Sequence, residues 1–410
     1  MNFIKKKIKT LTNNNTPDYT LFFLSSALII ISILFSYSLS VYTVVYWDYS
    51  NYHFFIRELF TGVLAILIMW SLAQIKPDKL VPLMGWSLFV VFFILMVSIY
   101  FLPHSLVTES GGAKRWIRLP FVSISPIEFF KIGFIYFLAT SFSRKLVGIT
   151  KLPFLEEIKI ILPYFIVFIV VALVMGVMLK DLGQTVLLAL ILFIMMMFAN
   201  RSGKLFASII GVAVFGLVAL ILPFQHRVDR ILSWWSMIQD GILALMPADM
   251  ALRYRVDDFS EPYQVSNSLN AIYNGGFFGT GLGEGSLKLG FLSDVHTDFV
   301  LAGITEEIGL FGLVFVLGIL FAVVYRIFKI SRDIKKTEYH LFALGIGLMV
   351  SISFLINSYG ISAMIPIKGI AVPFLSYGGS SMLSIALAMG LVLSISRDVP
   401  KKEKKCKKKQ

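Results

Sequence analysis

The chain contains a single cysteine, Cys406, and few charged residues. One cysteine excludes a disulfide framework and a metal site built from cysteine ligands. Charged residues make up 15% of the 410 residues and hydrophobic residues 57%. A soluble domain has about 25% charged and about 45–50% apolar residues. Because long apolar runs also recur along the chain, the composition excludes a soluble globular domain and predicts a helical membrane protein.

The net charge of +13 would indicate a nucleic-acid partner if the chain were soluble. In a membrane protein, the topology accounts for the same charge, so no nucleic-acid partner is expected. The segment 401–409 carries seven lysines and one acid. We interpret it as a cytoplasmic anchor near anionic lipid.

The predicted fold class is all-α: a polytopic integral membrane protein with about ten transmembrane helices and a large extracytoplasmic loop. The chain divides into a cytoplasmic segment 1–18, a transmembrane domain 19–396 and a cytoplasmic lysine-rich tail 397–410. The predicted spans are roughly 19–41, 57–75, 80–102, 126–142, 160–179, 182–199, 205–223, 298–325, 339–360 and 378–396.

The distribution of lysine and arginine predicts the orientation. If the N-terminus is inside, inner segments hold 25 of the 37 Lys and Arg residues. Outer segments hold 11, counting Arg57 at the edge of the second span, and Lys131 lies within a span. Positive residues favour the cytoplasmic side, so both termini are expected there.

Three outer segments carry most of the polar motifs: 103–125, 225–297 and 361–381. The segment 225–297 is by far the longest, and a loop of that length is often functional. Its stretch 266–274 has the apolar pattern of an interfacial helix.

The most distinctive stretch runs from Gly275 to Gly312. Its first half is glycine-rich, its second half is an apolar helix containing acids, and His296, Thr297 and Asp298 stand at the join. A carboxylate at the outer boundary of the membrane could be partly buried, which would raise its pKa toward the range of a general base. We therefore expect an active site here, with Asp298 as its base. The alternative is that Asp298 caps the helix that follows it.

Seven motifs together resemble the SEDS family, whose FtsW, RodA and SpoVE members polymerise peptidoglycan from lipid II. The resemblance covers nearly all predicted spans in the family's order. The residues of the motifs are closer to the division member FtsW than to the elongation member RodA. The motifs are GAKRWI at 112–117, SPIEFFK at 125–131, KDLGQT at 180–185, YQVSNSLNAIYNGGFFGTGLGEGSLK at 263–288, HTDF at 296–299, EEIGLFG at 306–312 and PIKGIAVPFLSYGGSS at 366–381.

Three features depart from the family pattern. Lys180 stands where the family usually has proline, and Pro262 stands where it commonly has glycine. Residues 236–260 resemble an insertion. These departures concern the contacts of the outer loop and leave the family motifs intact.

The resemblance implies a peptidoglycan glycosyltransferase in a bacterial cytoplasmic membrane, acting at the division septum. Lipid II and an undecaprenyl-diphosphate-linked glycan would be its substrates. A class B penicillin-binding transpeptidase and other divisome membrane proteins would be its partners. The family's essential aspartate corresponds to Asp298.

Stabilising a diphosphate leaving group requires donors and positive charge. Outer basic residues oppose the orientation bias, and Lys114, Arg115 and Lys368 also lie within family motifs, so we favour these three. Contact with lipid headgroups or surface ion pairs is the alternative for each. Trp116 could stack on a sugar or anchor at the interface.

Four further ionisable residues that lie within predicted spans are candidates for a role near the site. Glu128 and Lys131, three residues apart, could form a structural ion pair or line the cavity beneath the active site. Helical geometry would allow Glu306 to share the cavity of Asp298 and would direct Glu307 toward a neighbouring helix.

The segment Ser376-Tyr377-Gly378-Gly379-Ser380 opens the last predicted span. Its small residues could allow close packing of helices, or its hydroxyls could bind sugar or phosphate. His296 is better placed beside Asp298 than as the partner of a serine nucleophile. No cofactor is certain, although Asp298 and a diphosphate could share Mg²⁺ or Mn²⁺.

Three other functions compete with septal polymerisation. A lateral-wall polymerase would be a closely related enzyme. A lipid II flippase would use charges near the middle of the bilayer, and a divisome scaffold would need no catalytic residue. The densest motifs lie in outer segments, which favours the enzyme.

Overall fold

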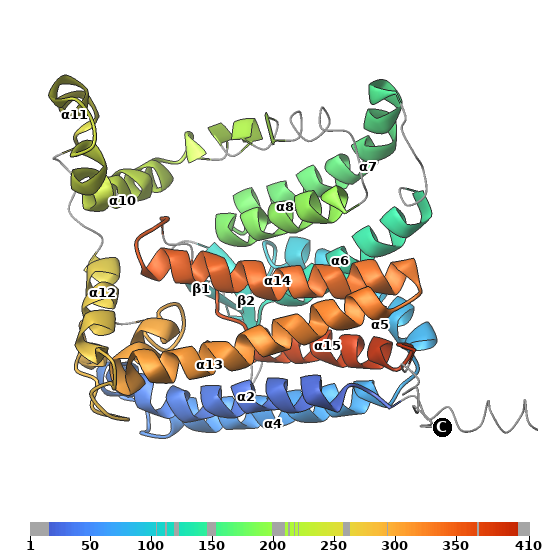
Figure 1. Cartoon of the computed structure of the whole chain (residues 1–410), viewed down its shortest axis with the longest axis horizontal. Coiled ribbons are helices and arrows are strands. Elements are labelled where there is room, and N and C mark those ends of the chain that lie inside the picture. Colours follow the sequence, from blue (N-terminus) through green and yellow to red (C-terminus); the bar gives the residue numbers. More distant parts are fainter. Residues whose placement is uncertain are drawn as a thin grey trace, which may run out of the picture.

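The computed structural model describes residues 16–103, 105–110, 113–118, 123–145, 153–198, 210–211, 214–216, 218–219, 221–256, 263–292, 294–366 and 369–400. A bundle of long helices forms its body (Figure 1). The bundle contains α2 (Tyr19–Leu39), α4 (His53–Ala73), α5 (Pro77–Ser98), α6 (Pro126–Lys145), α7 (Phe154–Leu173), α8 (Leu182–Met197), α13 (Val300–Asp333), α14 (Thr337–Ile361) and α15 (Gly379–Ser396).

The shorter elements connect the bundle helices. They are α3 (Val41–Tyr46), β1 (Val107–Ser110), β2 (Ala113–Arg118), β3 (Ser123–Ile124), the π-helix η1 (Val174–Met178), α10 (Gln225–Leu243), α11 (Ala248–Tyr254), α12 (Tyr263–Gly275) and the 3₁₀ helix η2 (Leu287–Leu289).

The predicted all-α membrane fold is confirmed. Among the described residues, seven helices are long and apolar enough to cross a bilayer, and the shorter apolar helix α8 accompanies them. Helix α6, which carries Glu128 and Lys131, also lies in the bundle. Nine of the 19 residues of the predicted span 205–223 lie outside the described residues, as do Lys368 and the lysine-rich segment 401–409.

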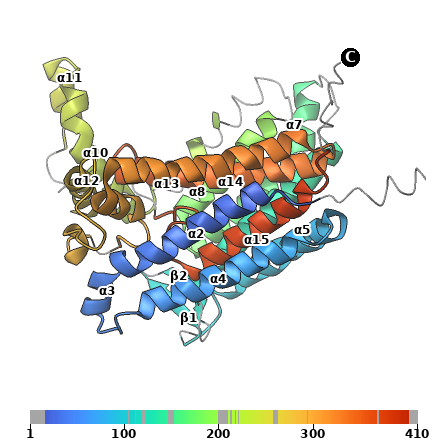
Figure 2. The ribbon, with the colours of Figure 1, turned by 60° about the horizontal axis from the view of Figure 1, so that its bottom comes forward.

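The bundle has two ends, which we call the terminal end and the site end. At the terminal end, the backbone N–H of Asp18 donates to Ser396 Oγ at 2.9 Å, and Arg326 pairs with the Asp18 carboxylate. The beginning of α2 and the end of α15 therefore meet. At the site end, α13 begins and α14 ends, and the shorter elements gather there (Figures 1 and 2).

Close helix packing depends on small residues. A Cβ added to Gly133 would lie 2.2 Å from the backbone nitrogen of Phe89, and one added to Gly85 would lie 2.2 Å from the ring of Tyr136. These glycines let α5 and α6 approach each other closely, as small residues do between membrane helices. Helices α14 and α15 are the most buried of the candidate spans.

A three-stranded antiparallel sheet replaces the loop expected between α5 and α6. The strands pair in the order β1-β2-β3, with Val107 opposite Ile117 and Ile117 opposite Ile124. Because β2 contains Lys114, Arg115 and Trp116, the sheet fixes the position of these residues at the site end.

Helix α13 is broken at Gly309, whose φ of 68° lies in the left-handed region. The glycine-rich loop fills the break with backbone hydrogen bonds. The N–H groups of Thr280 and Gly281 donate to the carbonyls of Glu306 and Glu307 at 2.9 and 3.0 Å, and the N–H of Leu310 donates to the carbonyl of Gly276 at 2.9 Å. The backbone groups freed by the break are thus satisfied within the protein, as a membrane protein requires.

Two buried carboxylates fasten this loop to α13. Glu306 accepts hydrogen bonds from the N–H groups of Ser286 and Leu287 at 2.9 and 3.1 Å, so its carboxylate is directed at the loop. Glu307 pairs with Lys288 at 2.6 Å and also accepts a hydrogen bond from Ser38 of α2. Glu307 thus contacts a neighbouring helix, as the helical geometry indicated.

The Lys288–Glu307 pair tests how firmly the loop is fastened. The Lys288 and Glu307 side chains are 2% and 0% exposed, so Lys288→Met leaves a buried carboxylate without its cation. We expect the free energy of unfolding, measured by SDS titration in mixed micelles, to fall by about 3–5 kcal/mol. The double variant Lys288→Met/Glu307→Leu should recover most of this loss. An equal loss of unfolding free energy in both variants would contradict a role for the unpaired charge.

Candidate active site

Asp298 lies in a turn immediately before α13. The carbonyl of Asp294 accepts hydrogen bonds from the N–H groups of Thr297 and Asp298, both at 3.1 Å. The side-chain amide of Asn357, on α14, donates to the carbonyls of Asp298 and Ile370 at 2.6 and 2.9 Å. These bonds fix the backbone of Asp298 between the end of α14 and the segment that follows it.

The carboxylate of Asp298 does not cap the helix. Helix α13 has Phe299 at its N-cap position, and no side chain makes a capping hydrogen bond. A Cβ on Gly369 would lie 3.0 Å from Asp298 Oδ2, so the carboxylate faces this glycine, whose φ is +58°. Among the described residues, no donor hydrogen-bonds the carboxylate, which leaves its oxygens available for a substrate.

The surroundings of Asp298 favour proton uptake. Its side chain is half-buried, and burial raises the pKa of Asp298 from its ordinary 3.8 to about 6. The nearby carboxylates of Asp294 and Asp181 raise this pKa further, while Arg115 opposes the rise. A carboxylate with a pKa in this range can accept a proton near neutral pH.

Strand β2 and the turn between α7 and α8 bring Arg115 and Asp181 to this carboxylate. The guanidinium of Arg115 donates to the carbonyls of Leu179 and Lys180 at 3.1 and 2.7 Å. Asp181 caps α8 by accepting a hydrogen bond from the N–H of Gln184 at 3.1 Å. Burial also raises the pKa of Asp181, and Arg115 counteracts that effect. Arg115 thus holds the turn and supplies positive charge beside two acids.

Lys180 has a φ of +53° in this turn. Proline cannot adopt a positive φ, because its ring fixes φ near −65°. The local backbone, which follows the π-helix η1, therefore excludes the family's proline at this position.

Glu128 and Lys131 form an ion pair at 2.9 Å, and Gln184 of α8 joins both of them. Lys131 donates to Gln184 Oε1 at 2.9 Å, and Gln184 Nε2 donates to Glu128 at 3.1 Å. The three side chains also line a cavity of about 20 Å³ together with Ser353 and Ser384. This volume is enough for about one water molecule. The ion pair is therefore present, and the same two side chains line this small cavity.

The hydroxyls of Ser376 and Ser380 hold the site's loops together. Ser376 Oγ donates to the carbonyl of Thr297 at 2.7 Å, and Ser380 Oγ donates to the carbonyl of Ser123 at 2.7 Å. The N–H of Tyr377 donates to the carbonyl of His296 at 2.9 Å. The SYGGS segment thus joins the Asp298 turn to β3.

His296 points into an aromatic cluster. Its ring lies 5.3 Å from that of Phe54 and 5.5 Å from that of Tyr377. Burial lowers the pKa of His296 to about 4, so the imidazole is neutral at physiological pH. Among the described residues, its buried Nδ1 has no hydrogen-bond partner. These contacts place His296 in the support of the turn.

The other residues predicted for the site are distributed around it. Lys114 Nζ donates to the carbonyl of Leu102 at 3.3 Å, and Trp116 lies opposite Thr108 in the sheet. Thr297 Oγ1 donates to the carbonyl of Asp294 at 3.2 Å. Lys368 cannot be placed, since it lies outside the described residues.

Sequence reasoning did not single out Asp181, Asp294 or Asn357. Asp181 lies within the motif KDLGQT, so membership of a family motif could have indicated it. Asn357 had a different signal, because a polar side chain in an apolar span normally faces the protein interior. Asp294 gave no signal beyond its position in the loop.

No group of three or more metal-binding side chains occurs among the described residues. Asp298 and Asp181 are acids of the kind that bind Mg²⁺, which is usually held by one or two carboxylates together with substrate phosphates. The described residues would therefore fit a divalent cation only if a bound diphosphate completed its ligands.

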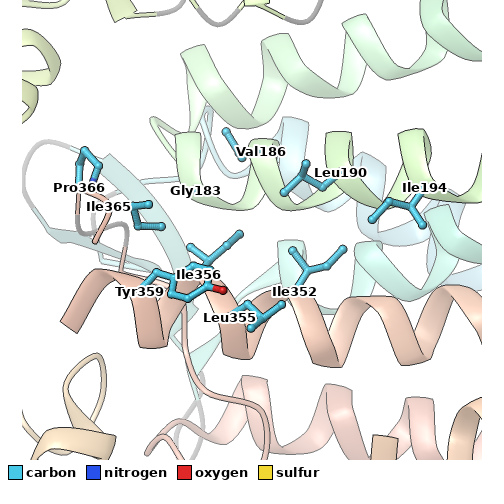
Figure 3. Close-up of a pocket in the computed structure, with 10 residues that line it drawn as sticks. All are labelled: Gly183, Val186, Leu190, Ile194, Ile352, Leu355, Ile356, Tyr359, Ile365 and Pro366. Atoms are coloured by element: carbon cyan, nitrogen blue, oxygen red, sulfur yellow. The ribbon is translucent and has the colours of Figure 1, made fainter. Parts of the chain in front are cut away.

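An apolar groove opens between α8 and α14 at the site end. It has a volume of about 370 Å³, and its lining side chains are drawn in Figure 3. Val186, Leu190 and Ile194 face it from α8, and Ile352 and Tyr359 from α14. Gly183, two residues from Asp181, also lines the groove, so the apolar space adjoins the charged turn.

The fold and the site define a class: a multi-pass helical membrane protein whose acidic site lies where extramembrane loops meet the ends of the spans. A family model described as cell cycle protein, covering FtsW, RodA and SpoVE, matches residues 19–401. The chain belongs to this family.

Relatives of known name cover nearly the whole chain. The probable peptidoglycan glycosyltransferase FtsW of Helicobacter pylori is 47% identical over 384 residues, covering 93% of this chain and 99% of that one. The probable peptidoglycan glycosyltransferase FtsW of Bacillus subtilis is 34% identical over 411 residues, covering 95% and 93%.

Solved structures share the fold. A chain from a peptidoglycan synthase complex that coordinates polymerization and crosslinking has a TM-score of 0.69 at 19% identity, covering 93% of this chain and 98% of that one. The rod shape determining protein RodA of Thermus thermophilus has a TM-score of 0.61 at 19% identity, covering 94% and 98%.

The raised pKa of Asp298 can be tested without a substrate. In an infrared pH titration, we expect a carboxyl C=O band with a midpoint near pH 6 that is missing from Asp298→Asn. Asp294→Asn removes a neighbouring negative charge, so the midpoint should move to lower pH. A midpoint near pH 4 in the unaltered protein would contradict the assignment.

Proposed function

We propose that this protein polymerises lipid II into glycan strands at the outer face of the cytoplasmic membrane. The observation that carries the proposal is the half-buried Asp298 carboxylate, which has a raised pKa and lies at the end of a membrane bundle beside Arg115. In the reaction, a sugar hydroxyl of the acceptor gives its proton to Asp298 and attacks the anomeric carbon of the donor. The bond from that carbon to the diphosphate breaks, and the lipid diphosphate leaves as an anion.

Positive charge for the leaving group gathers near the turn of Lys180. The guanidinium of Arg227 is buried, donates to the carbonyl of Gly176 at 2.8 Å and lies 4.3 Å from the centre of the Phe224 ring. Burial lowers the pKa of His226, and the charges of Arg227, Arg230 and Lys180 lower it further. Cations from two separate segments therefore converge beside the groove, as stabilisation of a diphosphate requires.

The groove between α8 and α14 suits the lipid tail of such a substrate. Its described lining residues include no charged side chain, and Leu190, Leu355 and Tyr359 remain exposed on it. A polyprenyl chain in this groove would place its diphosphate near Gly183 and the cations above. The sugars would then lie outside the spans, on the side of Asp298.

The relatives support the partner and the division role in this proposal. The names of the H. pylori and B. subtilis proteins support a division role, and the synthase complex supports a transpeptidase as partner. We place the site end outside and the terminal end in the cytoplasm, because Arg144, Lys145, Arg326, Lys329 and Lys336 lie toward the terminal end. Enrichment at the septum is part of this proposal.

Lipid II flipping is less well supported. A flippase needs a polar route through the bundle, but the cavity at Glu128 and Lys131 is only about 20 Å³ and its charges are paired. The large groove is apolar. This arrangement suits a substrate whose tail stays in the bilayer while its head reacts at one end.

The catalytic assignment predicts a specific loss of activity. With purified lipid II and the transpeptidase partner, Asp298→Asn should lower the rate of strand formation by about 100- to 10,000-fold, the usual contribution of a general base. Glu284→Gln alters an exposed acid of the same outer loop and should retain activity. Strand formation by Asp298→Asn at the normal rate would refute the role of the base.

The pH dependence should follow the same carboxylate. Asp298 acts as a base only when ionised, so activity should fall as the pH drops through about 6 and should be complete above neutrality. Rates of strand formation measured between pH 4.5 and 8 would show this acid limb. A rate that rises as the pH falls through this window would indicate that the essential group works protonated.

A further inference from the structure

The outer loop contains a helical hairpin that has no role in the proposed reaction. It consists of residues 236–256, comprising the second half of α10, the connection and α11. The amide of Gln239 makes two hydrogen bonds to the backbone of Val256, both 2.9 Å, and Trp235 Nε1 donates to the carbonyl of Tyr254 at 2.9 Å. Arg255 pairs with Asp240 at 3.1 Å. The returning chain is therefore fastened to α10.

The tip of this hairpin is apolar and uncovered. No residue of α11 is buried, and Leu245 and Leu252 are 88% and 75% exposed. Met250 and Tyr254 are also exposed. A helix of seven residues is not stable alone in water, and an exposed apolar cluster on a small projection indicates a missing contact.

The position of the hairpin indicates what supplies that contact. In both ribbon views, α11 projects from the site end on the side of α7 and α8, away from α2 and α4 (Figures 1 and 2). Trp234 Nε1 fastens the base of the hairpin to the carbonyl of Ala363 at 2.8 Å. The next residues, Met364, Ile365 and Pro366, lead to the groove, and Met364 is 64% exposed. Trp234 thus joins the base of the hairpin to the segment that leads to the groove.

We propose that the hairpin is an interfacial anchor, with the apolar side chains of α11 inserted in the outer leaflet beside the groove. Its charge fits this environment, because Asp249 balances Arg253 within α11 and Asp240 neutralises Arg255. Leucine, methionine and tyrosine are side chains that enter the boundary between headgroups and acyl chains. Anchoring α10 in this way holds the helix that carries Arg227, whose guanidinium donates to the carbonyl of Gly176 at 2.8 Å. The outer orientation of the site end rests on the proposed function.

Lipid contact can be measured at single positions, because Cys406 is the only cysteine and Cys406→Ser removes it. In that background, Leu245→Cys and Leu252→Cys each carry an environment-sensitive NBD label. Gly241→Cys is the matched control, since a Cβ there meets nothing within 4 Å and the site adjoins the Asp240–Arg255 pair. The labelled full chains are reconstituted in vesicles of phosphatidylethanolamine and phosphatidylglycerol, with and without lipids carrying a doxyl quencher near the headgroup.

The labels at 245 and 252 should emit at shorter wavelength than the label at 241. Doxyl lipid should quench them more strongly than aqueous iodide does, with the reverse order at 241. Replacing Leu245, Met246 and Met250 by serine should remove the blue shift at 252. Equal iodide quenching at all three positions without doxyl quenching would overturn the anchor and indicate a docking surface for another protein. A blue shift that survives the serine substitutions would also overturn it, since the label would then enter lipid by itself.

Assays of strand formation separate this inference from the proposed function. If the anchor is absent and activity still depends on Asp298, only the inference fails. If the labels lie in lipid and Asp298→Asn is fully active, the anchor stands and the catalytic assignment fails.

Discussion

The site depends on one constraint: a carboxylate must remain half-buried at the end of a membrane bundle without a donor that would satisfy it. Burial raises the pKa of Asp298, and a capping or hydrogen-bonding role would lower it again. The structure avoids both. Helix α13 begins after Phe299, and Gly369 offers the carboxylate a backbone without a side chain. The oxygens therefore remain without a donor among the described residues, in an environment that is unfavourable for the charge.

The other elements of the site end maintain this arrangement. Asn357 and Ser376 hold the carbonyls of Asp298 and Thr297, and the neutral ring of His296 packs between Phe54 and Tyr377. Below them, the glycine-rich loop fills the break of α13 and is fastened by Glu306 and by the Lys288–Glu307 pair. Most of the polar side chains in the family's motifs therefore position the turn and its loops, while the carboxylate of Asp298 accepts no hydrogen bond from the described residues.

Much of the fold could be predicted from the sequence, because apolar length alone identifies a membrane span. The position of Asp298 at the end of a span followed from the same pattern. The break at Gly309 could not be predicted, since it depends on backbone hydrogen bonds to a loop about thirty positions earlier in the chain. The short strands around Arg115 pair with their sequence neighbours, Val107 with Ile117 and Ile117 with Ile124, but they were not expected from the sequence. For Glu306, helical geometry would allow the side chain to share the cavity of Asp298. In the structure, its carboxylate instead accepts a hydrogen bond from the N–H of Ser286 in the glycine-rich loop. The proximity of Asp181 to Arg115 could not be predicted either, because Arg115 lies 66 positions earlier in the sequence.

The most direct test of the central claim is a structure of Asp298→Asn bound to two lipid II molecules and its transpeptidase partner. The proposal predicts the acceptor hydroxyl within about 3.2 Å of the side chain at position 298, the reach of a general base. It also predicts the donor diphosphate beside Lys180 and Arg227. An acceptor hydroxyl that instead contacts Asp181, with position 298 remote from both sugars, would contradict the account.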